Sequence, residues 1–225
     1  MNMIKVLDHG HVRLFECMGN DLSVVRNARV SYDAEWRAGV DTGSDARLIR
    51  YLYNNGHTSP FEAVTFTFDI KCPLFVARQW HRHRTWSYNE VSARYTELPE
   101  EYYVPDLGNI GTQHNSHKQM RDLKENPHAE MIVDSIRDLA SDAFDVYKDL
   151  LAQGAPREIA RLVLPLNTYT HFFGTVNLHN LFHFLKLRLH PHAQWEIQEY
   201  ARAILELITP EVAACVAAFR EKEGV

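Results

Sequence analysis

The feature that most constrains the fold is a short stretch of strict alternation in the first third of the chain. Four apolar residues, Val64, Phe66, Phe68 and Ile70, alternate with the polar residues Thr65, Thr67, Asp69 and Lys71. A period of two predicts a β-strand with one buried face and one polar face. Pro73 follows at once and suits the first turn of a helix, so we expect a helix from Leu74 to about Arg82.

The rest of the chain mixes helix and strand signals without a regular βαβ repeat. Strands are predicted at 11–18 and 169–176, and helices at 21–29 (capped by Asp21), 44–56, 128–153, 156–165, 177–189 (capped by Asn177) and 193–208. The fold class is therefore α+β (mixed α/β), with a central antiparallel or mixed sheet flanked by helices. A length of 225 residues suits one large domain or two small ones. The polar segment 106–127 is predicted to be a mobile loop.

Composition and charge narrow the classes of function. The chain has 24 Lys and Arg against 29 Asp and Glu, a net charge of −5, which argues against a generally basic nucleic-acid binder. No apolar run approaches the ~20 residues of a membrane span, and no apolar leader is evident. Cys17, Cys72 and Cys215 form no CxxC pair. We therefore expect buried thiols in a cytoplasmic protein without a membrane or nucleic-acid partner.

The densest chemistry lies in segment 78–95, RQWHRHRTWSYNEVSARY. It carries four arginines, two histidines and interleaved Trp and Tyr, and only Glu90 and Glu97 lie nearby to neutralise the arginines. Arginine binds phosphate with a two-pronged fork, and aromatic faces beside it suit a flat heterocycle. Because no GxxxxGK[ST] or GxGxxG loop is present, side chains would hold the phosphate. The segment predicts an anionic ligand that carries a ring, such as a nucleotide.

A second polar face is predicted on the helix after Asn177. His179 and His183 are four residues apart, and His190 and His192 come just after. Such a pair can ligate a metal, but HExxH is absent, so a face that binds a ligand or another subunit is favoured. Two alternatives stay open on the residues alone. One is a metal hydrolase that uses these histidines, and the other is a module that binds single-stranded RNA through the Arg and aromatic residues.

A long motif in the arginine-rich segment resembles the signature of a known enzyme family. Arg82-His83-Arg84, seven further residues and then Ser92 reproduce the RHR-x7-S signature of flavin-dependent thymidylate synthases, and Arg94 also agrees. The blocks NARVSYD, GHTSPFE, PREIARLVLPLN and HAQWEIQEYA resemble the same family in the same order. The resemblance covers nearly the whole chain, and it implies that family's fold in a single domain over residues 1–225.

The resemblance also implies a reaction and its partners. The reaction is the reductive methylation of dUMP to dTMP, with FAD as the cofactor and no metal. The co-substrates are 5,10-methylenetetrahydrofolate, which gives the one-carbon unit, and NADPH, which reduces the flavin. Family members work as homotetramers with shared active sites, so a homotetramer is implied here.

Specific site residues follow from the matched motifs. The residues implied to bind dUMP are Gln79, Trp80, His81, Arg82, Glu90, Val91, Ser92, Ala93, Arg94, Arg161 and Arg188. The residues implied to bind FAD are Ser31, Ser59, Glu62, Arg82, His83, Arg84, Asn89, Glu90, Asn177, Leu178, His179 and His183. His57 is implied on the folate and nicotinamide side. This chain differs from the family pattern at Ser59, where Thr is common, and at His179 and His183, where Arg and Asn occur in some members.

Arg188 and Ser92 are the residues implied in catalysis. Addition of hydride or another nucleophile at C6 of uracil makes an enolate at O4, and a fixed guanidinium stabilises that charge as it develops. The resemblance puts Arg188 in this role. No cysteine falls in a matching block, so the chain offers no evident activated thiol. We interpret Ser92 as a substrate-binding hydroxyl, because a serine nucleophile needs a base to activate it.

Overall fold

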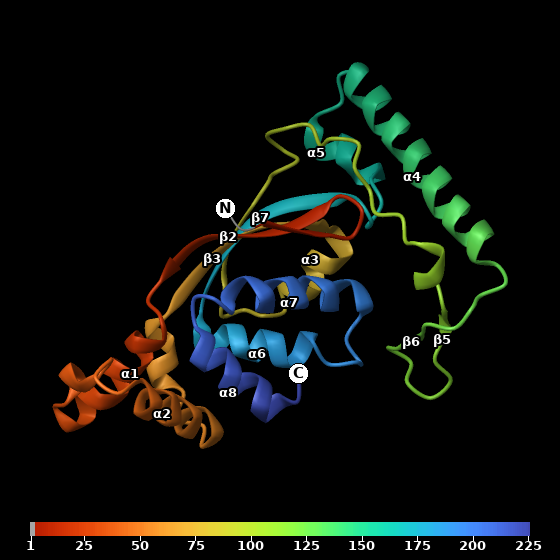
Figure 1. The fold of residues 1–225 in the computed structure, drawn as a ribbon. Helices are drawn as coiled ribbons and strands as arrows, with labels where there is room; N and C mark the ends of the chain where they lie inside the picture. The colour runs from red at the N-terminus through yellow and green to blue at the C-terminus, as the bar shows by residue number, and fades with distance from the viewer. Residues whose placement is uncertain (1–2) are drawn as a thin grey trace.

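A five-stranded antiparallel sheet organises the molecule (Figure 1). The computed structural model describes residues 3–225, and the spatial order of the strands is β1-β2-β3-β7-β4. These strands are β1 (Met3–Val6), β2 (Gly10–Met18), β3 (Thr65–Pro73), β7 (Tyr169–Asn177) and β4 (Ser87–Glu90). The predicted central sheet is confirmed in its antiparallel form, and the alternating stretch is its middle strand. Strands β1 and β4 are short and were not predicted.

Eight α-helices lie within the described residues. They are α1 (Asp21–Arg29), α2 (Thr42–Asn54), α3 (Leu74–Trp80), α4 (Ala129–Ala152), α5 (Arg157–Ala160), α6 (Leu178–Arg188), α7 (Trp195–Ile208) and α8 (Ala213–Glu223). Short 3-10 helices occur at η1 (Val30–Tyr32), η2 (Glu35–Arg37), η3 (Ser59–Ala63), η4 (Leu107–Asn109) and η5 (Arg161–Val163). The predicted helices are present: α1 has its predicted bounds, the helix predicted at 156–165 is divided into α5 and η5, and the others differ by a few residues at their ends. Within residues 3–225, no helix combines the length and the apolar character that crossing a membrane requires.

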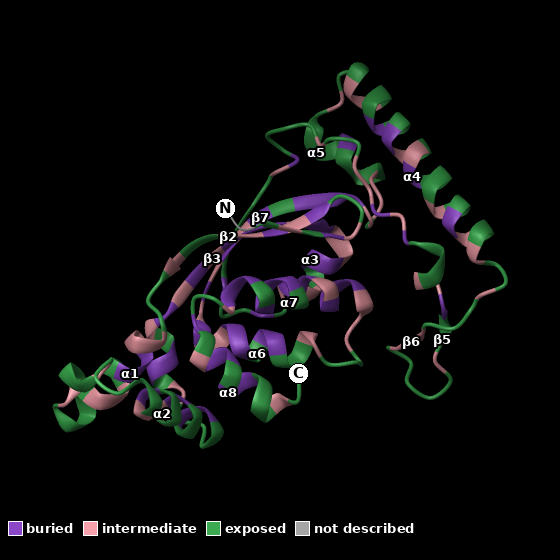
Figure 2. Ribbon diagram, in the orientation of Figure 1, coloured by how far each residue is buried: buried purple, intermediate pink, exposed green. Residues whose placement is uncertain are grey.

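One face of the sheet carries the main hydrophobic core. Phe66, Phe68 and Ile70 of β3 are fully buried, and helices α3, α6 and α7 cover this face (Figures 1 and 2). Trp80, the last residue of α3, stacks on Phe184 of α6 with ring centroids 4.9 Å apart. Burying one such side chain stabilises the fold by about 1.5–3 kcal/mol. The apolar face of β3 therefore anchors two helices. One is α3, which leads into the arginine-rich segment, and the other is α6, which ends at Arg188.

Helix α4 stands apart from this core (Figure 1). With α5 it forms a small second cluster of buried residues, Phe144, Tyr147 and Ala160. The segment before α4 contains η4 and a two-stranded hairpin of β5 (Thr112–Gln113) and β6 (Arg121–Asp122). Arg121 pairs with the buried Glu196 of α7 at 3.1 Å. Segment 106–127 therefore contains regular structure that is tied to α7, and its mobility stays a prediction.

The cap of α1 differs from the prediction. Asn20, and not Asp21, caps this helix, because the Asn20 side chain accepts a hydrogen bond from the Leu22 N–H at 3.0 Å. The two carboxylate oxygens of Asp21 instead accept from the N–H groups of Ala214 and Cys215, at 2.8 and 3.0 Å. Asp21 therefore supplies acceptors for the first turn of α8, a contact between the two ends of the chain that local sequence patterns do not encode.

We predict that Asp21→Ala lowers the free energy of unfolding by about 1–2 kcal/mol, because two N–H groups of α8 lose their acceptors. Urea denaturation measures this change. Asp142→Ala, at an exposed aspartate of α4, is the control and should shift the value by less than about 0.5 kcal/mol. Equal shifts in the two variants would contradict the capping role of Asp21.

Candidate active site

The signature residues occupy a turn between α3 and β4. Trp80 ends the helix, and Tyr88 on β4 holds the turn. Its single O–H is shared between the carbonyl oxygens of Trp80 and His83, which lie 3.1 and 3.0 Å away. His83 is buried, whereas Arg82 and Arg84 are exposed. The sheet edge therefore fixes the backbone of the turn and leaves the two arginines free to reach a ligand.

Arg188 and His83 form the central contact of this region. Arg188 is the last residue of α6, and its Nε–H donates to Nε2 of His83 at 3.0 Å. Its Nη2 donates to the backbone carbonyl of Gln79 at 3.3 Å. Because Nε2 of His83 accepts, the ring carries its proton on Nδ1. The packing of α3 against α6 thus holds the guanidinium between two acceptors, neither of which is a carboxylate.

The electrostatics of this contact keep the histidine neutral. Burial, together with the neighbouring Arg188 and His183, lowers the pKa of His83 from 6.5 to about 4. Burial and the charge of Arg82 also lower the pKa of Arg188, although arginine stays protonated in proteins. A neutral imidazole accepts from the guanidinium without cancelling its charge. Arg188 therefore keeps a full positive charge at a partly desolvated position, where its field is stronger than in bulk water.

The arginines around this contact lack acidic partners. Within the described part of the chain, no carboxylate forms an ion pair with Arg78, Arg82 or Arg84. The nearby acids are engaged elsewhere: Glu90 accepts from the Thr170 hydroxyl at 2.5 Å, and Glu97 pairs with Arg157 at 3.4 Å. Three exposed guanidinium groups of like charge are therefore left uncompensated, which favours an anionic ligand.

Several residues implied to bind FAD lie on helix α6 or beside it. Asn177 caps this helix, as predicted, with its side-chain oxygen accepting from a first-turn N–H at 2.9 Å. The helix contacts η3, which carries Ser59 and Glu62. His179 and His183 lie one turn apart on α6, and the His183 ring is 6.0 Å from that of His83. A polar stripe thus runs along α6 from η3 to the Arg188 contact.

A second group of implied dUMP residues lies at the far end of β4. Ser92 Oγ accepts from the Arg94 backbone N–H at 3.3 Å, and Arg94 pairs with Glu158 of α5 at 3.1 Å. Arg161 directly follows α5. We call Ser92, Arg94 and Arg161 the Arg94 group, and Gln79, Arg82, His83 and Arg188 the Arg188 group.

The two groups are separate within one chain. Strand β4 (Ser87–Glu90) lies between them and by itself spans about 10 Å. Asn89 and Glu90 are on this strand, and Val91 comes just after it. Among residues 3–225, no hydrogen bond or ion pair joins the Arg94 group to the Arg188 group. One chain therefore presents two separate sets of implied dUMP residues.

Three of the implied site residues are core residues. Trp80 and Leu178 are 0% exposed and Ala93 is 8% exposed. Their side chains pack inside the protein, so only their backbone atoms are available to a ligand, and their part in binding stays a prediction. Ser31 and His57, by contrast, are exposed on the segments that follow α1 and α2. His81 is partly buried, and its Nε2 meets no partner in residues 3–225.

Sequence reasoning missed two supporting residues. Gln194 precedes α7, and its side-chain amide contacts that of Gln79. It also lines a cleft of about 500 Å³ between β6 and the start of α7. The matched block HAQWE contains Gln194, but nothing in its spacing indicated this contact. Tyr88 was noted only as one aromatic residue among several, and its link to the signature turn is visible only in three dimensions.

The histidines proposed for a metal hydrolase do not converge. In residues 3–225, the one group of three or more His, Cys, Asp or Glu whose ligand atoms lie within 4.8 Å of one another is His11, Asp69 and His171. It contains none of His179, His183, His190 and His192. The metal-hydrolase alternative therefore has no geometric support at the predicted position.

Comparison with known proteins points to one family. The family model of the thymidylate synthase complementing protein, Thy1, matches residues 13–212. A flavin-dependent thymidylate synthase of Thermotoga neapolitana is 48% identical over 204 residues, covering 91% of this chain and 88% of the relative. One from Thermus thermophilus is 49% identical over 219 residues, covering 97% of this chain and 78% of the relative.

Solved structures agree with the sequence comparisons. The UMP/dUMP methylase PolB of Streptomyces cacaoi, bound with 5-Br dUMP, superposes with a TM-score of 0.86 at 36% identity and covers 97% of both chains. The same protein bound with 5-Br UMP gives a TM-score of 0.87. The fold and the match over most of the chain define an enzyme of the Thy1 type. This chain belongs to the flavin-dependent thymidylate synthase family, as the sequence motifs predicted.

The neutral state of His83 predicts a pH dependence of stability. Because its pKa is 6.5 in the unfolded reference and about 4 in the fold, the unfolded chain binds more protons between these values. The free energy of unfolding should therefore fall as the pH drops from about 6.5 to about 4, and His83→Gln should lack this part of the loss. Chemical denaturation at a series of pH values measures both proteins. Identical pH profiles would contradict the assignment.

Proposed function

We propose that this protein catalyses the reductive methylation of dUMP to dTMP, with FAD as cofactor and with 5,10-methylenetetrahydrofolate and NADPH as co-substrates. The observation that carries the proposal is the Arg188 guanidinium, fixed by neutral His83 among arginines without acidic partners. A nucleoside monophosphate offers a phosphate to such arginines and pyrimidine carbonyls to Arg188. Membership of the family and the likeness to a UMP/dUMP methylase support the same substrate.

The role of Arg188 follows from where charge develops. When a nucleophile or hydride adds at C6 of the uracil ring, negative charge moves onto the carbonyl oxygen. A guanidinium already oriented towards that oxygen stabilises the charge without reorganising. His83 and the Gln79 carbonyl hold two of the Arg188 nitrogens, which leaves Nη1 for the substrate. His83 is a positioning residue in this account, because it acts through Arg188.

The residues present fit a flavin dinucleotide. Its diphosphate needs cationic donors. Arg82 and Arg84 are exposed on the turn that Tyr88 holds, and neither has a carboxylate partner in residues 3–225. His179 and His183 continue the polar stripe towards η3, as an extended ligand requires. When bound, FAD supplies the hydride-transfer chemistry of the reaction. The protein's own share is to bind, to orient and to place charge.

We propose further that each active site is shared between chains of a homotetramer. The Arg188 group and the Arg94 group both contain residues implied to bind dUMP, yet β4 separates them in one chain. In a symmetric oligomer, the Arg94 group of one chain can face the Arg188 group of another, so that both contact one nucleotide. The site is incomplete in a single chain on this proposal.

Arg188→Ala should lower the rate of dTMP formation by about 10²–10³-fold while the protein still binds FAD, because only charge stabilisation in the reaction is lost. Chromatographic assay of dTMP and the visible flavin spectrum measure the two properties. Arg137→Ala, at an exposed arginine of α4 that pairs with Asp134, is the matched control and should keep near-normal rates. Full activity in Arg188→Ala would overturn the proposed function.

Shared sites predict that two inactive variants complement each other. Arg188→Ala and Arg94→Ala should each be inactive alone, and their co-assembled mixture should recover about one quarter of the normal activity per chain, since a quarter of the sites then contain both intact groups. Differently tagged chains, co-expressed and purified through both tags, give the mixed assembly. A mixed assembly with no recovered activity would contradict site sharing.

A further inference from the structure

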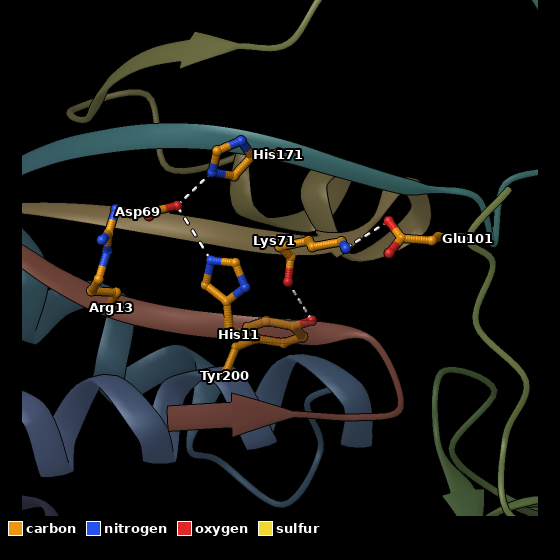
Figure 3. Close-up of polar contacts among 7 residues, drawn as sticks. All are labelled: His11, Arg13, Asp69, Lys71, Glu101, His171 and Tyr200. Atoms are coloured by element: carbon orange, nitrogen blue, oxygen red, sulfur yellow. Dashed lines mark hydrogen bonds and ion pairs between the residues drawn. The ribbon is translucent and has the colours of Figure 1, made fainter. Parts of the chain in front are cut away.

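A cluster of two histidines and an aspartate lies on the sheet face that the core helices do not cover (Figure 3). The three residues come from three adjacent strands: His11 from β2, Asp69 from β3 and His171 from β7. His11 and His171 both pair in register with Lys71, and Asp69 lies two residues away on β3. Side chains two residues apart on a strand share a face, so both rings reach Asp69 from opposite sides.

The potential ligand atoms of His11, Asp69 and His171 lie close together. Nε2 of His171 is 2.5 Å and Nε2 of His11 is 3.4 Å from the same oxygen, Oδ1 of Asp69, and all three atoms lie within 4.8 Å of one another. Ligand atoms around a tetrahedral zinc ion lie about 3.3 Å apart, given bonds of about 2.0–2.1 Å. The His171 side chain is 46% exposed, so its ring can withdraw by the small distance that an ion needs.

The groups around Asp69 favour the ionised form of its carboxylate. Asp69 is only 4% exposed. Burial raises its pKa, but hydrogen bonds from His171, His11 and Arg13 outweigh that effect and leave the pKa below the ordinary value. Arg13 pairs with Oδ2, on the other side of the carboxylate, which orients Oδ1 towards the rings. The Lys71 ammonium is turned away and pairs with Glu101 at 2.6 Å (Figure 3).

We propose that His11, Asp69 and His171 bind one divalent transition-metal ion, with zinc as the preferred ion, and so clip strands β2, β3 and β7 together. Two imidazoles and one carboxylate are a ligand set that zinc favours. An imidazole ligates the ion through an unprotonated Nε2, with its one ring proton on Nδ1. The open side at His171 leaves the fourth position to water. This site is separate from the Arg188 group and does not depend on the proposed function.

The test uses full-length protein without a histidine tag. Metal-free protein is titrated with Co²⁺, whose visible absorption reports coordination by nitrogen and oxygen, and the Co²⁺ is then displaced with Zn²⁺. We expect one ion per chain, and at least about tenfold weaker binding in His171→Ala, which loses one of three ligands. The matched control is His117→Ala, because His117 is an exposed histidine whose ring lies 5.1 Å from that of His192 in a different histidine cluster.

A second readout separates binding from misfolding. Zn²⁺ should raise the melting temperature of the wild-type protein and of His117→Ala, but not of His171→Ala. A circular dichroism spectrum of metal-free His171→Ala that matches the wild type shows that the variant folds. Unchanged affinity in His171→Ala, binding lost in His117→Ala instead, or no uptake by the wild-type protein would each overturn the proposal.

Discussion

The contact between Arg188 and His83 is the interaction on which the candidate site depends. A guanidinium at the end of α6 donates to an imidazole on the turn after α3, at 3.0 Å. The contact requires a neutral ring, and burial beside positive neighbours provides one by lowering the pKa of His83 to about 4. A carboxylate in the place of His83 would hold Arg188 more tightly but would neutralise the charge that a substrate needs. The site therefore keeps an oriented cation that is still available.

The fold that creates this contact could largely be predicted from local patterns. The alternation in β3 and the Asn177 cap of α6 follow from neighbouring residues, and both are present. Pro73, predicted in the first turn of the next helix, instead ends β3 and occupies the N-cap position directly before α3. Strand β4 could not be predicted, because its four residues show no alternation and pair only with the edge of β7. The Asp21 contact with α8 likewise depends on tertiary packing between residues far apart in sequence.

The candidate site was predictable in its residue types more than in its geometry. The arginine-rich segment and its shortage of nearby acids indicated an anionic ligand, and the structure leaves Arg82 and Arg84 without acidic partners in residues 3–225. The apolar spacing after Asn177 places Leu178 on the buried face of its helix, and it is buried. The pattern could not reveal that Trp80 is a core residue, because the packing of α3 against α6 determines which side of α3 is buried. Nor could it reveal that β4 divides the implied dUMP residues into two groups. Those outcomes depend on contacts between elements that no local spacing encodes.

The most direct test of this account is the protonation state of His83. Nitrogen NMR of protein labelled with ¹⁵N-histidine, with the His83 signals assigned by their loss in His83→Gln, reports each ring nitrogen separately. We predict that at pH 7 the ring is neutral, with Nδ1 protonated and Nε2 accepting from Arg188. A protonated ring at pH 7, or a proton on Nε2, would contradict it, because neither state can accept the Arg188 hydrogen bond.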